Sequence, residues 1–215
     1  MARIRKAGRL WREDALATAA GVMVGCDGPV FSLEPNALFS RTAPLELEIG
    51  AGRGEFIIER AGAFPDRNFL AVELSAKIAQ LLAMRAARSG VTNLRVVRMD
   101  ARTLVHMMLP DRSLAACHIY FPDPWPKMKH AKHRLFSTEF IATLGGKLEP
   151  DAPLFIATDV KAYAEKIFAM AASAGMQPLD IPVPGADGTG FARKFLAAGI
   201  AIYARAYSAH ALVEH

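Results

Sequence analysis

The chain has 215 residues, of which 52% are hydrophobic, and a formal net charge of +5 with a pI near 9.4. This length suits a single domain with its own core, and the basic balance is a weak indication of an anionic partner. Two cysteines, Cys26 and Cys117, are too few for a disulfide framework or a metal cluster, so we expect small buried side chains in a reducing compartment.

The first part of the chain shows little periodic pattern. We expect an irregular or weakly helical arm over residues 1–40 and one folded domain over residues 41–215. Glu13 and Asp14 interrupt the place where the apolar core of an export signal would begin. No run of about 20 apolar residues occurs, which argues against a membrane span. The sequence therefore predicts a soluble, cytoplasmic protein.

From Leu45 onward, short runs typical of strands alternate with helical patterns. Helices are predicted at 55–64, 75–90 and 160–175, and strands at 45–49, 69–73, 94–99, 115–121 and 153–159. Residues 176–190 are rich in Pro and Gly and predict a loop, and the run 195–207 predicts a final strand. This alternation indicates a Rossmann-like, doubly wound α/β domain with a mostly parallel seven-stranded sheet and helices on both faces.

A glycine-rich turn follows the first strand of this domain. Gly50, Gly52 and Gly54 would let a ligand approach the backbone at the start of the next helix. Glu55 stands where a dinucleotide-binding turn would have its third glycine, and an acid there would face a pyrophosphate badly. The spacing therefore disfavours a nicotinamide dehydrogenase and favours a ligand with a positive charge and no phosphate.

Four carboxylates lie at or just beyond the ends of predicted parallel strands: Glu48, Glu73, Asp100 and Asp123. Ligands bind along this edge in open α/β sheets, and Glu73 lies where such sheets offer a carboxylate to ribose hydroxyls. Asp100 could accept a hydrogen bond from the exocyclic amine of adenine. An adenosine joined to a cationic group fits this set, which implies S-adenosylmethionine (SAM). The arrangement resembles the class I SAM-dependent methyltransferases.

The segment FPDPWPK, residues 121–127, holds Asp123 between two prolines, which restrict the backbone on both sides of it. In class I methyltransferases this loop faces the transferable methyl group. A basic run follows directly and predicts contacts with phosphates; it comprises Lys127, Lys129, His130, Lys132, His133 and Arg134. Trp125 could stack on a base or simply anchor the loop.

PDPWPK followed by a basic segment and then RL resembles the tRNA (guanine-N7-)-methyltransferases. The resemblance covers about residues 45–205, with further matches in LEIG, NLRVVRMDA and ATDVKAYAE. It implies methyl transfer from SAM to a guanine in the tRNA variable loop, at position 46 in this family. It implies cofactor contacts at Glu48, Glu73, Asp100 and Asp123, with Asp123 also catalytic. Substrate contacts are implied at Lys127 and Asp159, and tRNA contacts along residues 129–134. A substrate contact is also implied at Thr189, the first residue of a family motif near the C-terminus.

One position departs from the family pattern. The family motif Thr-x-(Phe/Tyr)-Glu has its counterpart in residues 189–192, where Ala192 replaces the glutamate. The loss of a carboxylate near the guanine could lower activity, redirect it, or be offset by a neighbour. A catalytically impaired tRNA-binding relative, and a class I methyltransferase with another substrate, therefore remain alternatives. The oligomeric state, monomer or homodimer, leaves no sign in the sequence.

Overall fold

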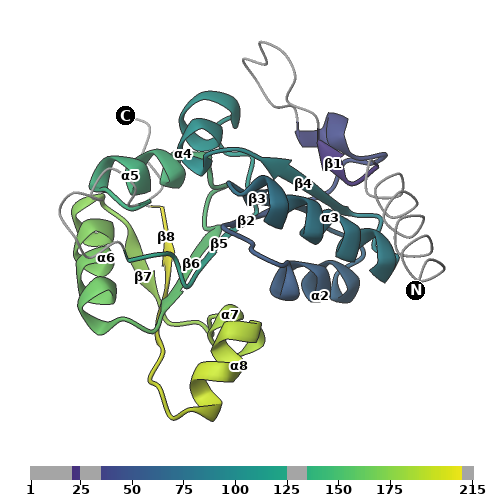
Figure 1. Cartoon of the computed structure of the whole chain (residues 1–215). Helices are drawn as coiled ribbons and strands as arrows, with labels where there is room; N and C mark the ends of the chain where they lie inside the picture. Colours follow the sequence, from purple (N-terminus) through teal and green to yellow (C-terminus); the bar gives the residue numbers. More distant parts are fainter. Residues whose placement is uncertain (1–20, 25–34, 125–134, 210–215) are drawn as a thin grey trace, which may run out of the picture.

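The computed structural model describes residues 21–24, 35–124 and 135–209. They form one sheet with the strand order β1-β4-β3-β2-β5-β6-β8-β7 (Figure 1). Strands β1 to β6 pair in parallel, and β8 runs antiparallel to both β6 and β7. The strands are β1 (Met23–Val24), β2 (Leu45–Ile49), β3 (Asn68–Glu73), β4 (Leu94–Arg98), β5 (Ala116–Tyr120), β6 (Pro153–Thr158), β7 (Gln177–Leu179) and β8 (Tyr203–Ser208).

Helices cover both faces of the sheet, as the alternating pattern predicted (Figure 1). Along the described chain they are η1 (Pro35–Leu38), α2 (Glu55–Ala63), α3 (Ala76–Ser89), α4 (Ala101–Thr103), the short π-helix η2 (Leu104–Met108), α5 (Thr138–Lys147), α6 (Lys161–Ser173), α7 (Gly185–Gly188) and α8 (Gly190–Ala197). Two buried cores result. One packs α2 and α3 against the sheet, and the other packs η2, α5 and α6 against the opposite face.

The side-chain period of each strand divides its residues between these cores. In β2, Leu45, Leu47 and Ile49 enter the core of α5 and α6. Glu46 and Glu48 therefore point to the opposite face, toward α2, although both are buried. The central strand thus places two carboxylates in the interior.

The α/β fold class and the parallel order of the central strands are confirmed. Three details of the expectation were wrong. Residues 23–24 form an eighth strand within the arm expected to be irregular. The loop expected at 176–190 contains β7 and α7. The strand expected at 195–207 begins only at Tyr203, because Thr189 caps a helix that continues to Ala197.

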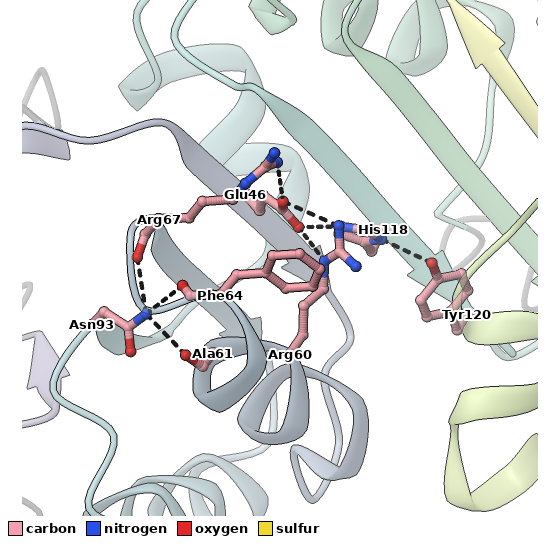
Figure 2. A network of polar contacts seen from close by, with 8 residues as sticks. All are labelled: Glu46, Arg60, Ala61, Phe64, Arg67, Asn93, His118 and Tyr120. Atoms are coloured by element: carbon pink, nitrogen blue, oxygen red, sulfur yellow. Dashed lines mark hydrogen bonds and ion pairs between the residues drawn. The ribbon is translucent and has the colours of Figure 1, made fainter.

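A cluster of polar side chains ties β2 to β5 and α2 (Figure 2). The Glu46 carboxylate accepts hydrogen bonds from Arg60, from Arg67 Nη1 at 2.7 Å and from His118 Nε2 at 2.9 Å. Burial alone would raise the pKa of Glu46, but the hydrogen bonds from His118 and Arg60 outweigh burial and lower it to about 2. Glu46 is therefore ionised at neutral pH.

The ionised carboxylate also fixes the protonation of His118. Burial lowers the pKa of His118, so the ring is neutral, and its Nε2–H donates a hydrogen bond to Glu46. Nδ1 is then an acceptor, and the Tyr120 hydroxyl donates to it at 2.8 Å. Glu46 thus orients His118, and His118 orients Tyr120 at the carboxyl end of β5. We call this chain of hydrogen bonds, Glu46–His118–Tyr120, the His118 relay.

Glu46→Gln should destabilise the fold by about 3 kcal/mol at pH 7, because Arg60 and His118 lose a charged partner in the interior. The pKa of Glu46 is lowered from 4.5 to about 2. The extra free energy of unfolding of the wild type over the variant should therefore be lost as the pH falls from 4.5 toward 2. Urea unfolding of the variant and the wild type at pH 7 and pH 3 measures both effects. The exposed Glu165→Gln on α6 is the matched control. Equal unfolding midpoints for Glu46→Gln and Glu165→Gln at pH 7 would contradict the assignment.

Candidate active site

The turn after β2 leaves its backbone open to a ligand. Gly50, Gly52 and Gly54 adopt left-handed φ angles of 72°, 54° and 73°. An added Cβ would meet at most a backbone oxygen 4.0 Å away at Gly52, and nothing within 4 Å at Gly50. At Gly54 it would overlap the Leu82 side chain of α3. Gly54 therefore serves the packing of α2 against α3, whereas Gly50 and Gly52 free space at the carboxyl edge.

Glu73 ends β3 beside this turn. Its Oε2 accepts from the Gly52 N–H at 3.2 Å, and its Oε1 accepts from the Ser75 N–H at 2.8 Å. These two bonds fix the carboxylate before any ligand arrives. The role of Glu73 as a partner for ribose hydroxyls stays a prediction.

Two pockets meet at the turn and share Gly50, Glu73, Tyr120 and Phe121. The smaller, about 380 Å³, extends toward Asp100 and Asp123. The larger, about 530 Å³, extends along the start of α2 toward α8 and is also lined by Glu48, Glu55, Phe56, Thr189, Gly190 and Lys194. Three of the predicted carboxylates, Glu73, Asp100 and Asp123, thus share the smaller pocket, and Glu48 lies with Glu73 in the larger.

Glu48 is the least satisfied carboxylate in the site. It is 4% exposed, and its Oε2 has no hydrogen-bond partner among the described residues. Burial raises its pKa from 4.5 to about 8, against a smaller lowering by the Ile57 backbone. A cationic ligand group in the larger pocket would stabilise the ionised form of this carboxylate and lower its pKa.

Asp100 has a partner that the sequence did not indicate. It caps α4, and Arg102 donates to Oδ1 from its backbone N–H at 2.9 Å and from Nε at 3.1 Å. Hydrogen bonding by Arg102 lowers the pKa of Asp100. A carboxylate accepts several bonds, so an adenine amine would share Asp100 with Arg102, which also lines the smaller pocket.

Asp123 is exposed at the mouth of the smaller pocket. The turn before it is anchored by Phe121, whose N–H donates to the Ala157 carbonyl at 2.7 Å. Phe121 has a φ of 50°, an uncommon value for an aromatic residue, and its ring lies 5.4 Å from that of Phe195 in α8. The start of the proline loop is thus attached to both β6 and α8.

The other predicted substrate residues divide into three cases. Thr189 lines the larger pocket, where its Oγ1 accepts from the Ala192 N–H at 2.9 Å. Asp159 follows β6 but lines neither of these two pockets. Trp125 and the whole basic run lie outside the described residues: Lys127, Lys129, His130, Lys132, His133 and Arg134.

Tyr120 forms part of the wall of both pockets and was not predicted as a site residue. The backbone N–H of Gly185 donates to its hydroxyl, and a Cβ at Gly185 would overlap its ring. Tyr120 therefore joins the His118 relay to α7. The only sign of this residue in the sequence was the alternation of polar and apolar residues in CHIY, residues 117–120, a pattern that is common in half-buried strands. Lys194, which lines the larger pocket, was not predicted as a site residue either; it lies between the predicted loop, which ended at 190, and the predicted strand, which began at 195.

Comparison with known proteins supports a methyltransferase. A family model described as "Putative methyltransferase" matches residues 42–178. The tRNA (guanine-N(7)-)-methyltransferase of Nitrosomonas eutropha is 43% identical over 140 residues, which are 64% of this chain and 62% of that protein. Proteins with the same name from Syntrophotalea carbinolica and Sodalis glossinidius are 39% and 38% identical, covering 78% and 80% of this chain and 75% and 72% of their own lengths.

Solved structures support the fold. The 16S rRNA methyltransferase KamB superposes with a TM-score of 0.60 at 18% identity, covering 81% of this chain and 92% of its own. A mutant of the 16S rRNA (adenine(1408)-N(1))-methyltransferase from Catenulisporales acidiphilia was solved with its cosubstrate SAM. It superposes with a TM-score of 0.58 at 18% identity, covering 85% of this chain and 91% of its own. At this identity the likeness concerns the fold alone.

Glu48→Gln should change how stability depends on pH. Between pH 4.5 and 8 the folded wild type holds a proton on Glu48 that the unfolded chain releases, so its stability falls as the pH rises. The variant has no such proton, so its free energy of unfolding should rise relative to that of the wild type, by on the order of 4 kcal/mol at pH 8. Urea unfolding at pH 5, 6, 7 and 8 measures the difference. A constant difference across these values would show that Glu48 titrates normally.

Proposed function

The chain belongs to the tRNA (guanine-N7-)-methyltransferase family, and we propose that it transfers a methyl group from SAM to N7 of a guanine in the tRNA variable loop, at position 46. The observation that carries this proposal is the row of carboxylates along one sheet edge, joined to two connected pockets. No described helix is long and apolar enough to cross a membrane. We expect the protein to act on tRNA in the cytoplasm.

The described residues fit SAM. Glu73, already fixed by Gly52 and Ser75, would bind the ribose hydroxyls, and Asp100 would accept from the adenine amine. Glu48, with an unpartnered oxygen in the larger pocket, would pair with the ammonium group of the methionine part. When bound, SAM supplies a methyl group already activated by its positive sulfur.

The reaction places modest demands on the side chains. Guanine N7 has a free lone pair at neutral pH, so no base has to remove a proton before attack. Holding N7 in line with the methyl group can supply up to about 7–11 kcal/mol of the barrier reduction in favourable cases. As positive charge passes onto the purine, a carboxylate beside the ring stabilises it or holds the Watson–Crick edge. Asp123, at the mouth of the smaller pocket, is proposed for this role.

The basic run after Asp123 is proposed to hold the RNA. Its members Lys127, Lys129, His130, Lys132, His133 and Arg134 follow directly on the proline loop. Phosphate contacts fix the position of a nucleic acid without reading its sequence, so this segment would present the guanine to the site. Thr189 and Asp159 are proposed as further substrate contacts, and Trp125 as a stacking partner for a base.

Asp123→Ala should abolish formation of N7-methylguanosine while the fold remains intact, because the charge developing on guanine loses its carboxylate. The assay incubates the protein with labelled SAM and unmodified tRNA, followed by nucleoside analysis. Circular dichroism and the urea unfolding midpoint control for folding. Methyl transfer by the wild type supports the enzyme, and binding of both ligands without transfer supports the impaired relative. Near-normal turnover by Asp123→Ala would remove Asp123 from the catalytic role.

Replacing Lys129, Lys132 and Arg134 by Ala should weaken tRNA binding and flatten its salt dependence. Loss of three phosphate contacts should reduce the slope of log affinity against log salt by about 2–3. The matched control replaces Lys77, Arg88 and Lys161, which are exposed on α3 and α6. An unchanged slope in the first variant, or an equal loss in both, would assign the basic run to the solvated surface.

A further inference from the structure

The position that lacks the family glutamate lies in the first turn of α8. Thr189 is the N-cap of this helix, and Ala192 is the third residue after it. A glutamate in that place, three residues after a capping threonine, completes a capping box, in which its carboxylate bonds back to the N-cap N–H. Ala192 is fully buried and cannot do this. Helix α8 therefore has no acidic residue in its own first turn.

A carboxylate from another helix lies at the same turn. The space that a Cβ of Gly190 would fill is taken by the Glu55 carboxylate, whose Oε1 would be 3.1 Å from that Cβ. Gly190 is the first residue of α8, and Glu55 is the first residue of α2. The N-terminus of a helix carries a partial positive charge, so a carboxylate resting on it is favourable.

The contact is part of a larger interface between α2 and α8. Glu59, one turn after Glu55 and on the same face of α2, lies 3.9 Å from Arg193 of α8, but both side chains are more than half exposed. Such an exposed pair contributes little. Glu55 is less exposed and is also approached by Arg85 of α3, at 3.8 Å. Glu55 is thus the better candidate for holding α8.

We propose that Glu55 is a positioning residue whose carboxylate docks the N-terminus of α8 and thereby holds Thr189, Gly190 and Lys194 in the wall of the larger pocket. It replaces, from α2, the carboxylate that position 192 lacks. The role of the pocket as a SAM site rests on the proposed function, whereas the docking of α8 does not. The competing explanation is that Glu55 only supplies a favourable charge to the first turn of its own helix.

The first experiment compares Glu55→Gln and Glu55→Ala with the control Glu59→Ala. Hydrogen exchange of the α8 amides, measured on the ligand-free protein, should be faster in both Glu55 variants and unchanged in the control. SAM dissociation constants from calorimetry should rise about fivefold, the equivalent of losing one helix cap. Unchanged exchange in α8 for both Glu55 variants would overturn the proposal.

A double-mutant cycle with Gly190→Ala separates docking from a general loss of stability. Gly190 does not have a left-handed φ, and alanine is the better helix former, so the substitution should harm α8 only by displacing Glu55. It should accelerate α8 exchange in the wild type and slow it in the Glu55→Ala background. Equal effects in the two backgrounds would contradict the proposed contact.

A rescue variant restores the carboxylate within α8. Ala192→Glu, combined with Glu55→Ala, should recover most of the lost α8 protection by completing the capping box with Thr189. If this rescue fails and Gly190→Ala has equal effects in both backgrounds, Glu55 acts only on the first turn of its own helix, α2. A protein that binds no SAM at all would instead refute the proposed function, and the exchange data on the ligand-free protein would still decide the role of Glu55.

Discussion

The turn from Gly50 to Gly54 is the constraint on which the site depends. Three left-handed residues end β2, open the backbone at the sheet edge and start α2 at Glu55. Gly54 has a second reason to lack a side chain, because a Cβ there would overlap the buried Leu82 side chain of α3. The same turn orients the Glu73 carboxylate through the Gly52 N–H. Pocket shape, helix packing and one predicted ligand contact therefore follow from five consecutive residues.

Two carboxylates of β2 show how environment divides their roles. Glu46 and Glu48 point to the same face, two residues apart. Glu46 meets Arg60, Arg67 and His118, which keep it ionised and make it part of the framework. Glu48 Oε2 accepts no hydrogen bond from the described residues, and burial raises the pKa of Glu48 to about 8. A carboxylate that the protein leaves uncompensated beside a pocket is suited to a cationic ligand, at some expense in stability.

The sequence predicted the central strands and the edge at which the carboxylates gather, because β-branched runs and glycine turns are local signals. It did not predict α8, since the run from Phe195 to Tyr203 is apolar enough to suit a strand and only the capping bond of Thr189 marks the helix. Glu46 and His118 were missed for another reason. They lie 72 residues apart, and alternation within a strand does not reveal which polar residues meet across the sheet. The same holds for Glu55 and Gly190, which lie far apart in the sequence and meet only in the fold.

The central claim is that an uncompensated Glu48 makes the larger pocket a site for the cationic part of SAM. Calorimetry of SAM binding at pH 7, repeated in buffers of different ionisation enthalpy, measures the protons exchanged on binding. Since Glu48 is mostly protonated below its pKa of about 8, pairing with the ammonium group should release about one proton per SAM bound. Glu48→Gln should bind more weakly and release none. Tight binding by the wild type with no proton release, or with the same release in Glu48→Gln, would contradict the claim.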